Sequence, residues 1–390
     1  MSQQSFRALG VCPEIVRALA ERDIRVPFRI QELVLPDALA GLDVLAKSPT
    51  GSGKTLAFGL PLVERTSPGA GAPSALVLVP TRELAAQVAD QLEVLAGAKR
   101  LRVVAVYGGA PVSAQARSAR GAEILVATPG RLLDLVERRL VSLENVRILV
   151  LDEADRMLDM GFKPQVDRIV RRLPRERQTM FFSATLDGDV GELARAYTRD
   201  PSRFESGPAP QHARDVVEHK FVAVTADGKI NRLIEELGTE RGLALVFVRT
   251  KRGAERLVRK LAHHEVPALA MHGDMTQSGR ERALQRFRSG QVTTLVATDL
   301  AARGLDLVEI THVINFDPPA DDTGYVHRVG RTGRAGRGGS GITFVLPEQQ
   351  ADVSRVAARL GHRDQFEREG MRAAPAKLVY SSRRGRRSRW

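Results

Sequence analysis

The sequence predicts an α/β protein made of two tandem lobes, each a parallel sheet covered by helices. A chain of 390 residues exceeds the size at which a single hydrophobic core usually stops growing, so two domains are expected. Short apolar, strand-like runs alternate with amphipathic helical stretches in both halves, which is typical of parallel sheets with both faces covered. Between the halves, residues 205–214 are rich in Pro, Gly and Ala without apolar periodicity, which indicates a hinge.

Each half contributes five predicted strands. They are residues 75–81, 102–109, 122–129, 146–153 and 179–185, followed by 243–250, 266–273, 293–299, 311–317 and 341–346. The 43% hydrophobic content supports buried cores, and the 5% aromatic content indicates that the sheets are mainly aliphatic. The tetrapeptide LVAT opens both 125–134 and 295–304, which fits two related lobes. We place the first lobe at residues 1–204, a linker at 205–215, the second lobe at 216–365 and a basic tail at 366–390.

Residues 50–56 (TGSGKTL) end an apolar stretch and open a helix-like one, as a phosphate-binding loop does. Gly51 and Gly53 allow a tight turn that aims backbone N–H groups at anionic oxygens. Lys54 would reach the β- and γ-phosphates, and Thr55 would place its hydroxyl on Mg²⁺. Thr50 and Ser52 complete the loop. Ser48 stands where the strict pattern has a glycine, so a Gly/Ser turn with a solvated lysine is the alternative for this segment alone.

The apolar run 146–151 delivers Asp152, Glu153, Ala154 and Asp155 at the carboxyl end of a predicted buried strand. Adjacent carboxylates near a core are costly unless a cation or a reaction uses them. Asp152 suits the Mg²⁺ shell, and Glu153 suits orienting and deprotonating an attacking water. An acidic cap of the following helix is the alternative. The phosphate loop upstream favours the ATPase interpretation.

Residues 325–334 (YVHRVGRTGR) place Arg328, Arg331 and Arg334 at three-residue spacing. On a helix this spacing stacks the guanidinium groups on one face, where they repel unless an anion lies opposite. We predict that Arg331 and Arg334 are arginine fingers that complete the ATP site from the other lobe. The alternative is a solvated basic face or a nucleic-acid patch.

Taken together, these motifs resemble those of DEAD-box ATP-dependent RNA helicases of the bacterial type, within helicase superfamily 2. The resemblance covers about residues 5–360 and implies two RecA-like lobes. The motifs occur in the family's order: SPTGSGKT (48–55), PTREL (80–84), the glycine pair 108–109, TPGR (128–131), DEAD (152–155), SAT (183–185), LVFVRTK (245–251), Gln277 with Arg280, TDLAARGLD (298–306) and YVHRVGRTGR (325–334).

The resemblance also implies roles for single residues. Gln31 matches the glutamine that recognises adenine, and an amide can pair bidentately with that base. Asp306 matches the residue near the ribose. Ser183 and Thr185 match the element that couples hydrolysis to strand separation, through hydrogen bonds toward Asp155, and His327 has a structural or coupling role. The implied RNA contacts are Thr81, Arg82, Gly109, Thr128, Arg131, Thr250 and Thr298. Such groups position a sugar-phosphate chain without recognising its bases, so RNA binding should be independent of sequence.

The chain departs from the family pattern near the adenine site. The family usually has an aromatic residue where Ile24 stands, and Thr-Pro where Phe28 and Arg29 stand. We therefore expect weaker stacking on adenine, which makes selectivity for ATP over other nucleotides a weaker expectation than hydrolysis itself. Pro49 and Ser48 alter the entry to the phosphate loop, from which we expect altered affinity more than lost function.

The resemblance implies ATP and Mg²⁺ as cofactors and RNA, as single strands and short duplexes, as partner. ATP and RNA would each favour closure of the lobes, so the hydrolytic site assembles when RNA is bound. Duplexes of about ten base pairs are expected targets, because each step holds only ~1.4 kcal/mol. One alternative is an ATP-gated RNA clamp or annealing chaperone without productive unwinding. A DNA translocase is the other, against which the DEAD tetrad and Gln31 argue.

Net charge and cysteine content complete the picture. The net charge is +13, and residues 371–390 hold seven Lys or Arg and no acid, which leaves 13 − 7 = +6 for the rest. We expect this tail to be disordered and to attract RNA phosphates, with a compositional accident as the alternative. The single Cys12 excludes an intramolecular disulfide, and no apolar stretch or signal-peptide core indicates a membrane or secretion. A cytoplasmic location is therefore expected. The oligomeric state and protein partners stay open, with a monomer as one option.

Overall fold

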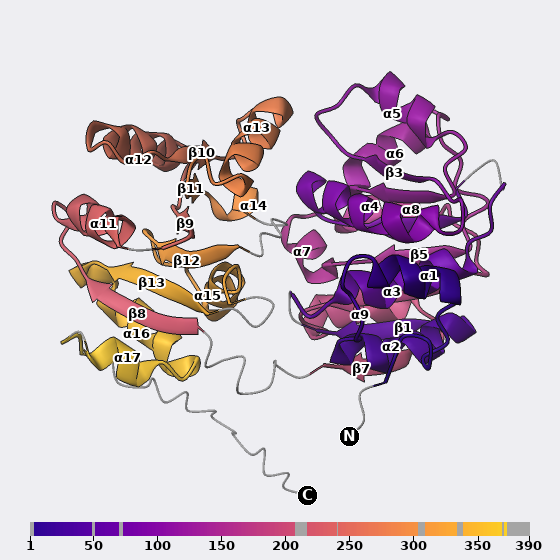
Figure 1. Ribbon diagram of the computed structural model, residues 1–390, viewed down its shortest axis with the longest axis horizontal. Helices are drawn as coiled ribbons and strands as arrows, with labels where there is room; N and C mark the ends of the chain where they lie inside the picture. Colours follow the sequence, from indigo (N-terminus) through magenta and orange to yellow (C-terminus); the bar gives the residue numbers. More distant parts are fainter. Residues whose placement is uncertain are drawn as a thin grey trace, which may run out of the picture.

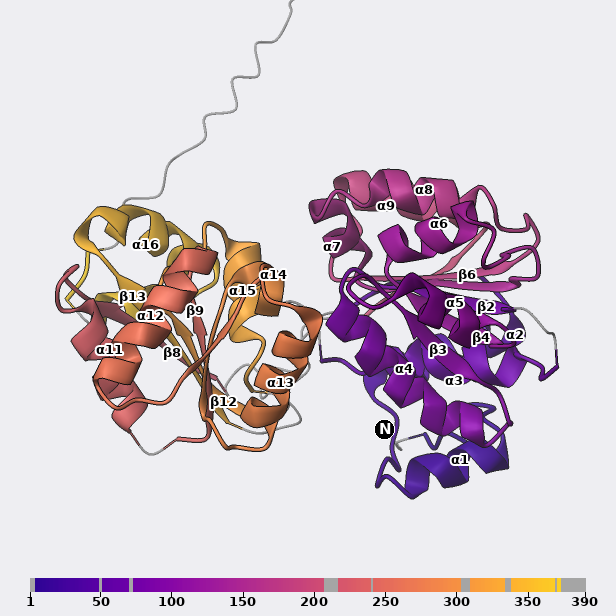
Figure 2. The ribbon, with the colours of Figure 1, turned by 90° about the horizontal axis from the view of Figure 1, so that it is seen from above.

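The computed structural model consists of two α/β lobes that lie side by side (Figure 1). It describes residues 4–48, 51–69, 73–206, 217–239, 241–302, 309–333, 338–368 and 370–372. Helices cover both faces of each sheet (Figure 2). The predicted architecture of two tandem lobes, each a parallel sheet between helices, is confirmed.

The first lobe has a seven-stranded sheet with the order β3-β4-β2-β5-β6-β1-β7, in which every neighbouring pair is parallel. The strands are β1 (Val44–Lys47), β2 (Ala75–Leu78), β3 (Val103–Val106), β4 (Ile124–Ala127), β5 (Ile148–Leu151), β6 (Gln178–Ser183) and β7 (Ser202–Glu205). The helices are α1 (Pro13–Ala20), α2 (Arg29–Ala40), α3 (Lys54–Arg65), α4 (Arg82–Gly97), α5 (Val112–Ala119), α6 (Pro129–Glu137), α7 (Ala154–Asp159), α8 (Lys163–Val170) and α9 (Gly188–Tyr197).

The second lobe has a six-stranded parallel sheet with the order β10-β11-β9-β12-β13-β8. Its strands are β8 (Val217–Ala223), β9 (Leu243–Phe247), β10 (Leu269–Met271), β11 (Thr294–Ala297), β12 (Ile310–Asn315) and β13 (Gly339–Val345). Its helices are α11 (Lys229–Gly238), α12 (Lys251–His263), α13 (Gln277–Arg288), α14 (Asp299–Ala302), α15 (Asp322–Val329), the 3₁₀ turn η1 (Pro347–Gln349), α16 (Gln350–Arg359) and α17 (Arg363–Arg368).

All ten predicted strands are present, and β1, β7 and β8 were not predicted from the sequence. Edge strands β7 and β8 are only half-buried, so they lack the continuous apolar run of a central strand. β1, with the four residues VLAK, is the apolar stretch that precedes the phosphate loop, which was noted in the sequence but not assigned as a strand. These strands were missed because their sequence signal is weak.

Apolar side chains on both faces of each strand hold the sheets in place. In β5, Ile148 and Val150 pack into one core cluster of the first lobe, whereas Leu149 and Leu151 pack into the other. A strand buried on both faces requires such a continuous aliphatic run. The carboxyl end of β5, where the acidic residues begin, is therefore anchored from two sides.

The second lobe extends beyond the boundary predicted at residue 365. Phe366 in α17 and Met371 are buried with Phe221 and Tyr325 in one hydrophobic cluster. The predicted start of the tail at residue 366 is thus too early, because the folded lobe includes residues up to at least Met371. Residues 207–216 and 373–390 lie outside the described residues, so the hinge and the basic tail stay predictions. No helix in the described part of the chain is long and apolar enough to cross a membrane.

Candidate functional site

Sheet order separates the candidate nucleotide residues from the candidate RNA residues. The phosphate loop, the acidic tetrad and the 183–185 segment follow β1, β5 and β6, which are neighbours in the sheet. Thr81, Gly109 and Thr128 follow β2, β3 and β4, which are neighbours on one side of the same sheet. Parallel sheets bind ligands at the carboxyl ends of their strands. The fold thus places two candidate sites side by side on one edge.

The loop between β1 and α3 has the backbone geometry that phosphate binding requires. Gly51 and Gly53 adopt φ angles of +81° and +88°, which favour glycine, and α3 begins at Lys54. The Lys54 ammonium donates to the Ser48 carbonyl at 3.2 Å, and the Ser48 and Ser52 hydroxyl oxygens are 2.5 Å apart. Thr50 lies outside the described residues. Ser48 therefore occupies the position of the expected glycine while its carbonyl holds the lysine.

Gln31 is anchored to the same loop. Its Nε2 donates to the Gly53 carbonyl at 2.9 Å, and its Oε1 accepts from the Phe28 backbone N–H at 2.9 Å. The side chain is buried. These two bonds fix which end of the amide is the donor and which is the acceptor. One hydrogen and one lone pair of the amide stay available for a ligand.

The acidic residues form a constrained turn. Glu153 has a φ of +52°, a left-handed conformation that is uncommon for residues other than glycine, and it precedes α7. Asp152 Oδ1 accepts from the Glu153 N–H at 2.9 Å, and Glu153 Oε2 lies 3.1 Å from Arg156 Nη1. Glu153 therefore caps no backbone N–H with its side chain. The acid that accepts a backbone N–H in the first turn of α7 is Asp155, whose Oδ1 accepts from Arg156 at 3.0 Å, whereas Glu153 lines the cavity described below.

Burial and neighbouring charges shift the pKa values of the Asp152 and Glu153 carboxyl groups in opposite directions. Burial raises the pKa of Asp152 to about 6, against the effect of Lys54 and with a contribution from Glu153. Burial also raises the pKa of Glu153, but Arg156, Lys54 and Arg331 outweigh it and hold that pKa below its usual value. Glu153 is thus a carboxylate at neutral pH, as a proton acceptor requires. Asp152 carries a charge that a cation would stabilise.

The contact between the tetrad and the 183–185 segment differs from the one predicted. Asp155 Oδ2 accepts from the Ala184 backbone N–H at 3.2 Å, while the Ser183 hydroxyl accepts from the Thr185 N–H at 3.3 Å. The segment is thus hydrogen-bonded to Asp155 as expected, but through the Ala184 backbone amide rather than through Ser183 or Thr185. The backbone makes the link because β6 ends with the Ala184 amide facing α7.

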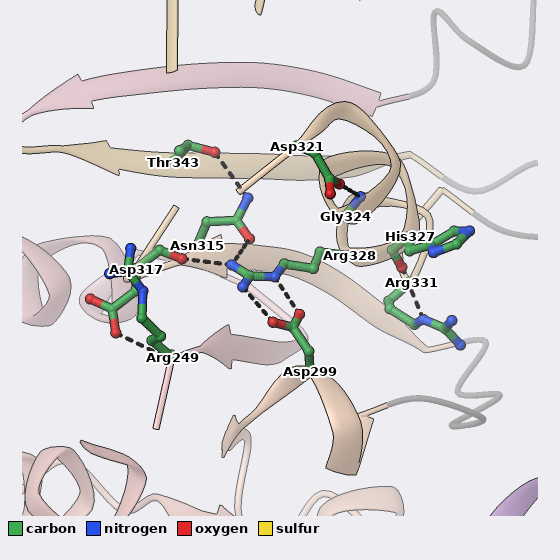
Figure 3. Close-up of polar contacts among 10 residues, drawn as sticks. All are labelled: Arg249, Asp299, Asn315, Asp317, Asp321, Gly324, His327, Arg328, Arg331 and Thr343. Atoms are coloured by element: carbon green, nitrogen blue, oxygen red, sulfur yellow. Dashed lines mark hydrogen bonds and ion pairs between the residues drawn. The ribbon is translucent and has the colours of Figure 1, made fainter. Parts of the chain in front are cut away.

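The first of the three spaced arginines is structural. Arg328 in α15 donates to Asp299 through Nε at 2.5 Å and Nη2 at 2.7 Å, and to Asn315 Oδ1 and the Asp317 carbonyl (Figure 3). Asn315 in turn donates to the Thr343 hydroxyl at 3.0 Å. Arg328 therefore ties α15 to α14, β12 and, through Asn315, β13. α15 ends at Val329, so Arg331 lies just beyond the helix, and the prediction that Arg328 and Arg331 share one helical face is wrong. The network instead anchors the end of α15 from which Arg331 follows.

Arg331 brings the second lobe to the nucleotide residues. Its side chain is 4% exposed, and its Nε donates to the His327 carbonyl at 3.2 Å (Figure 3). A cavity of about 350 Å³ is lined by Arg331 together with Gln31, Lys54, Asp152 and Glu153. The structure therefore unites candidate residues from both lobes around one space. Asp306 and Arg334 lie outside the described residues.

His327 lies between the acidic tetrad and the arginines. Burial, together with the nearby charge of Arg156, lowers its pKa to about 4, while Asp155 opposes the shift. The ring also borders a second cavity with Arg156, Asp299 and Arg331. His327 is thus a neutral group at the boundary between the lobes.

The candidate RNA residues are held by the backbone turns in which they lie. Thr81 and Thr250 accept from the N–H groups of Leu84 and Gly253 and so cap α4 and α12. Arg131 donates to the Ala110 carbonyl at 2.9 Å and to Gln115 Oε1 at 2.6 Å. Thr128 precedes α6, and Thr298 precedes α14. In the second lobe, Thr250 and Thr298 follow the neighbouring strands β9 and β11, so they too share one edge.

Gly109 and Arg82 are packed together. Gly109 has a φ of +93°, and a Cβ there would lie 2.3 Å from Arg82 Nη1. Arg82 Nη1 also lies 3.5 Å from Gln277 Oε1 in the second lobe. Glycine is therefore required both for the backbone conformation and for the approach of the arginine.

Sequence reasoning missed the role of Glu83. Its carboxylate pairs with Arg280 of the second lobe, and both side chains are buried. Both residues lie in or beside quoted motifs, Glu83 in PTREL (80–84) and Arg280 with Gln277, but nothing in the sequence indicates that they pair. Such a pairing depends on how the lobes sit together.

Comparison with known families and proteins places these features in context. The DEAD/DEAH box helicase family matches residues 28–193, and the helicase conserved C-terminal domain matches residues 228–336. The ATP-dependent RNA helicase CshA of Listeria monocytogenes is 42% identical over 348 residues, which are 88% of this chain and 66% of that protein. The DEAD-box ATP-dependent RNA helicase CshA of Bacillus subtilis is 39% identical over 349 residues, 89% of this chain and 70% of that protein. The chain thus spans about two thirds of the length of these relatives.

A solved structure matches the whole fold. S. cerevisiae Dbp5 bound to RNA and ADP BeF3 has a TM-score of 0.82 and 31% identity, and the match covers 92% of this chain and 94% of that chain. The likeness extends over both lobes.

Proposed function

Because this chain belongs to the DEAD-box family of RNA helicases, we propose that it is an RNA-stimulated ATPase that separates short RNA duplexes locally. The observation that carries the proposal is the single cavity lined by Lys54, Asp152 and Glu153 from one lobe and Arg331 from the other. A site divided in this way is complete only when the lobes meet. ATP turnover is then coupled to any ligand that binds both lobes, which in this proposal is RNA.

ATP would bind with its phosphates on the loop between β1 and α3. The backbone amides at the start of α3 and the Lys54 ammonium supply positive charge. Gln31 would pair its available donor and acceptor with N7 and N6 of adenine. Since the Phe28 and Gly53 bonds fix the orientation of the amide, guanine would set its O6 acceptor against Oε1. This arrangement supports a preference for ATP over GTP.

The residues present fit a magnesium ion bound together with the phosphates. Asp152 is a buried carboxylate that lines the cavity. Thr55, the residue after Lys54, lines the same cavity. Within the described residues, no group of three or more His, Cys, Asp or Glu could hold a metal. Mg²⁺ usually takes one or two protein ligands and completes its shell with phosphate oxygens and water. Bound there by Asp152 and the Thr55 hydroxyl, it would neutralise charge on the phosphates.

Glu153 and Arg331 would act on the two sides of the transferred phosphoryl group. The Glu153 carboxylate accepts a proton from the attacking water and orients it in line with the γ-phosphate. Arg331 stabilises the charge that develops on the phosphoryl oxygens. Arg334 is proposed as the second finger. His327, with Asp155 and the 183–185 segment, would transmit the state of the nucleotide to the boundary between the lobes.

RNA would lie across the carboxyl edges of both sheets. Thr81, Arg82, Gly109, Thr128 and Arg131 would hold the sugar-phosphate chain on the first lobe. Thr250 and Thr298 would hold it on the second. Capping hydroxyls, glycine backbone and arginines contact phosphate and sugar rather than base edges, which supports recognition independent of sequence.

The test is a comparison of steady-state ATPase rates without nucleic acid, with single-stranded RNA and with DNA of equal length. Glu153→Gln serves as the blank. Stimulation by RNA alone is expected, followed by separation of a duplex of about ten base pairs. Equal stimulation by DNA would favour a DNA translocase, and stimulation without strand separation would favour an RNA clamp or annealing chaperone.

A further inference from the structure

Phe28 is an unusual residue in the nucleotide cavity. It is 57% exposed, and among the described residues only four other large hydrophobic side chains are similarly exposed: Val26, Leu42, Leu300 and Val326. Of these five, only Phe28 lines the cavity with Gln31 and Lys54. It is also the only aromatic residue among the described residues that line it. An exposed ring at the mouth of a binding cavity offers an apolar face to a ligand.

The ring lies directly against the phosphate loop. A Cβ on Gly53 would lie 2.5 Å from Phe28 Cδ2, so the ring occupies the space that a side chain at Gly53 would need. The same Cβ would lie 2.5 Å from Gln31 Nε2. The Phe28 ring and the Gln31 amide thus flank one point of the loop. A base paired with that amide lies within reach of the ring.

Phe28 also violates a local preference. It is the N-cap residue of α2, with an extended φ and ψ of −76° and 159°. N-caps favour Ser, Thr, Asp or Asn, whose side-chain oxygen accepts from an exposed helix N–H. A phenyl ring has no acceptor, so α2 lacks this bond. Residues that break local preferences without a structural return are often functional.

Ile24 lines the same cavity but presents only an aliphatic surface. We propose that Phe28 provides the aromatic face on which the nucleotide base stacks, in place of the aromatic residue that Ile24 replaces. The inference rests on the proposed use of ATP and corrects the expectation that stacking is weak. Gln31 then selects the edge of the base, and Phe28 binds its face.

The direct test measures binding of a non-hydrolysable ATP analogue to the full chain without RNA. Stacking of a base on an aromatic ring is worth ~1–3 kcal/mol when removed by alanine, so Phe28→Ala should weaken binding roughly 5- to 150-fold. Tripolyphosphate, which has no base, should compete equally well against Phe28→Ala and the wild type. Equal weakening of both ligands, or of neither, would overturn the proposal.

A second variant separates stacking from a structural role. Phe28→Thr restores a capping hydroxyl to α2, so its melting temperature should rise by a few degrees while its affinity for the ATP analogue falls. If Phe28 had only a structural role, the affinity of Phe28→Thr for the ATP analogue would rise or stay unchanged along with its melting temperature. Val26→Ala is the matched control, because Val26 is exposed two residues away but does not line the cavity. Val26→Ala should leave the affinities for the ATP analogue and for tripolyphosphate unchanged.

A double variant that moves the aromatic ring from position 28 to position 24 provides the final check. In the double variant Ile24→Phe with Phe28→Thr, affinity for the ATP analogue should return to within about threefold of the wild type. No recovery, with a normal melting temperature, would count against stacking as the function of Phe28. These binding measurements do not depend on turnover. A wild type that binds ATP but shows no stimulation by RNA would refute the proposed helicase and leave the stacking inference standing.

Discussion

The carboxylate of Glu83 in α4 lies 2.7 Å from Nη2 of Arg280 in α13, across the boundary between the lobes. The two side chains are 7% and 10% exposed. The contact is an ion pair rather than an aligned hydrogen bond. Glu83 directly follows Arg82, a candidate RNA contact, and Gln277, one turn before Arg280, lies 3.5 Å from Arg82. The pair therefore fastens the lobes beside the proposed RNA path.

Removing one partner of this pair should impair closure. Glu83→Gln leaves the Arg280 charge buried and uncompensated, which typically costs ~3–5 kcal/mol. Because the pair joins the lobes, this cost should fall on their association rather than on the folding of either lobe. The RNA concentration for half-maximal ATPase stimulation should rise at least about tenfold, with a nearly unchanged melting temperature.

A double variant provides the control for this pair. Glu83→Gln with Arg280→Gln removes both charges, so its RNA requirement should be closer to the wild type than that of Glu83→Gln alone. If both variants are equally impaired, the pair does not hold the lobes together through its charges.

Lys54→Ala should abolish ATP turnover, reducing the rate to that of the Glu153→Gln blank. The lysine supplies the one ammonium among the described residues that line the cavity, and it begins the helix that follows the phosphate loop. Steady-state phosphate release is the measurement, with circular dichroism to verify folding. Retained turnover would remove the phosphate-loop assignment.

Arg331→Ala should lower kcat by about 10³ or more while ATP analogue binding changes little, because the group acts on transition-state charge. Arg328→Ala provides the contrast. Arg328 is bound to Asp299, Asn315 and the Asp317 carbonyl, so its loss should lower the melting temperature of the second lobe. An unchanged kcat in Arg331→Ala would leave that residue as a structural or RNA-binding group.

Gly109→Ala should weaken RNA binding and spare nucleotide binding. The added methyl group would displace Arg82, and a φ of +93° is strained for any residue with a Cβ. Fluorescence anisotropy of a labelled single-stranded RNA should show a loss of roughly tenfold or more. Gly130→Ala, at a position with open space around it, is the matched control. Equal RNA affinity in the two variants would contradict the role of the Gly109–Arg82 contact.

Acid should destabilise the second lobe through His219. Burial lowers the pKa of His219 to about 4, with a contribution from His362, whose ring centroid is 3.8 Å away. Its Nδ1 lies 2.8 Å from the Tyr325 hydroxyl. The unfolded histidine binds a proton below about pH 6.5. This stability is therefore fully present above pH 6.5 and is lost as the pH falls toward 4.

The expected loss is on the order of 1–3 kcal/mol, measured as the free energy of unfolding in urea at pH 7.5 and pH 4.5. His219→Gln should reduce this pH dependence, although His312 and His327 also have lowered pKa values and will keep part of it. His263→Gln removes an exposed histidine and serves as the comparison. If the free energy of unfolding changes with pH by the same amount in His219→Gln and in the wild type, His219 does not contribute to the acid sensitivity.

The sequence by itself determined the local features of this protein. Ten of the strands, the left-handed glycines of the phosphate loop and the acidic turn after β5 follow from patterns within about ten residues, because dihedral preference and burial periodicity act over that range. The assignment to the family rests on the order of such local motifs.

Only the tertiary structure decided how these pieces meet. It shows that Arg328 in α15 is an anchor while Arg331, just beyond that helix, lines the cavity, although both belong to the same sequence motif. It brings Glu83 to Arg280, which lie 280 − 83 = 197 positions apart. It also turns the ring of Phe28 onto Gly53. These relationships depend on strand order and on the placement of one lobe against the other, which arise from long-range packing and leave no periodic trace in the chain.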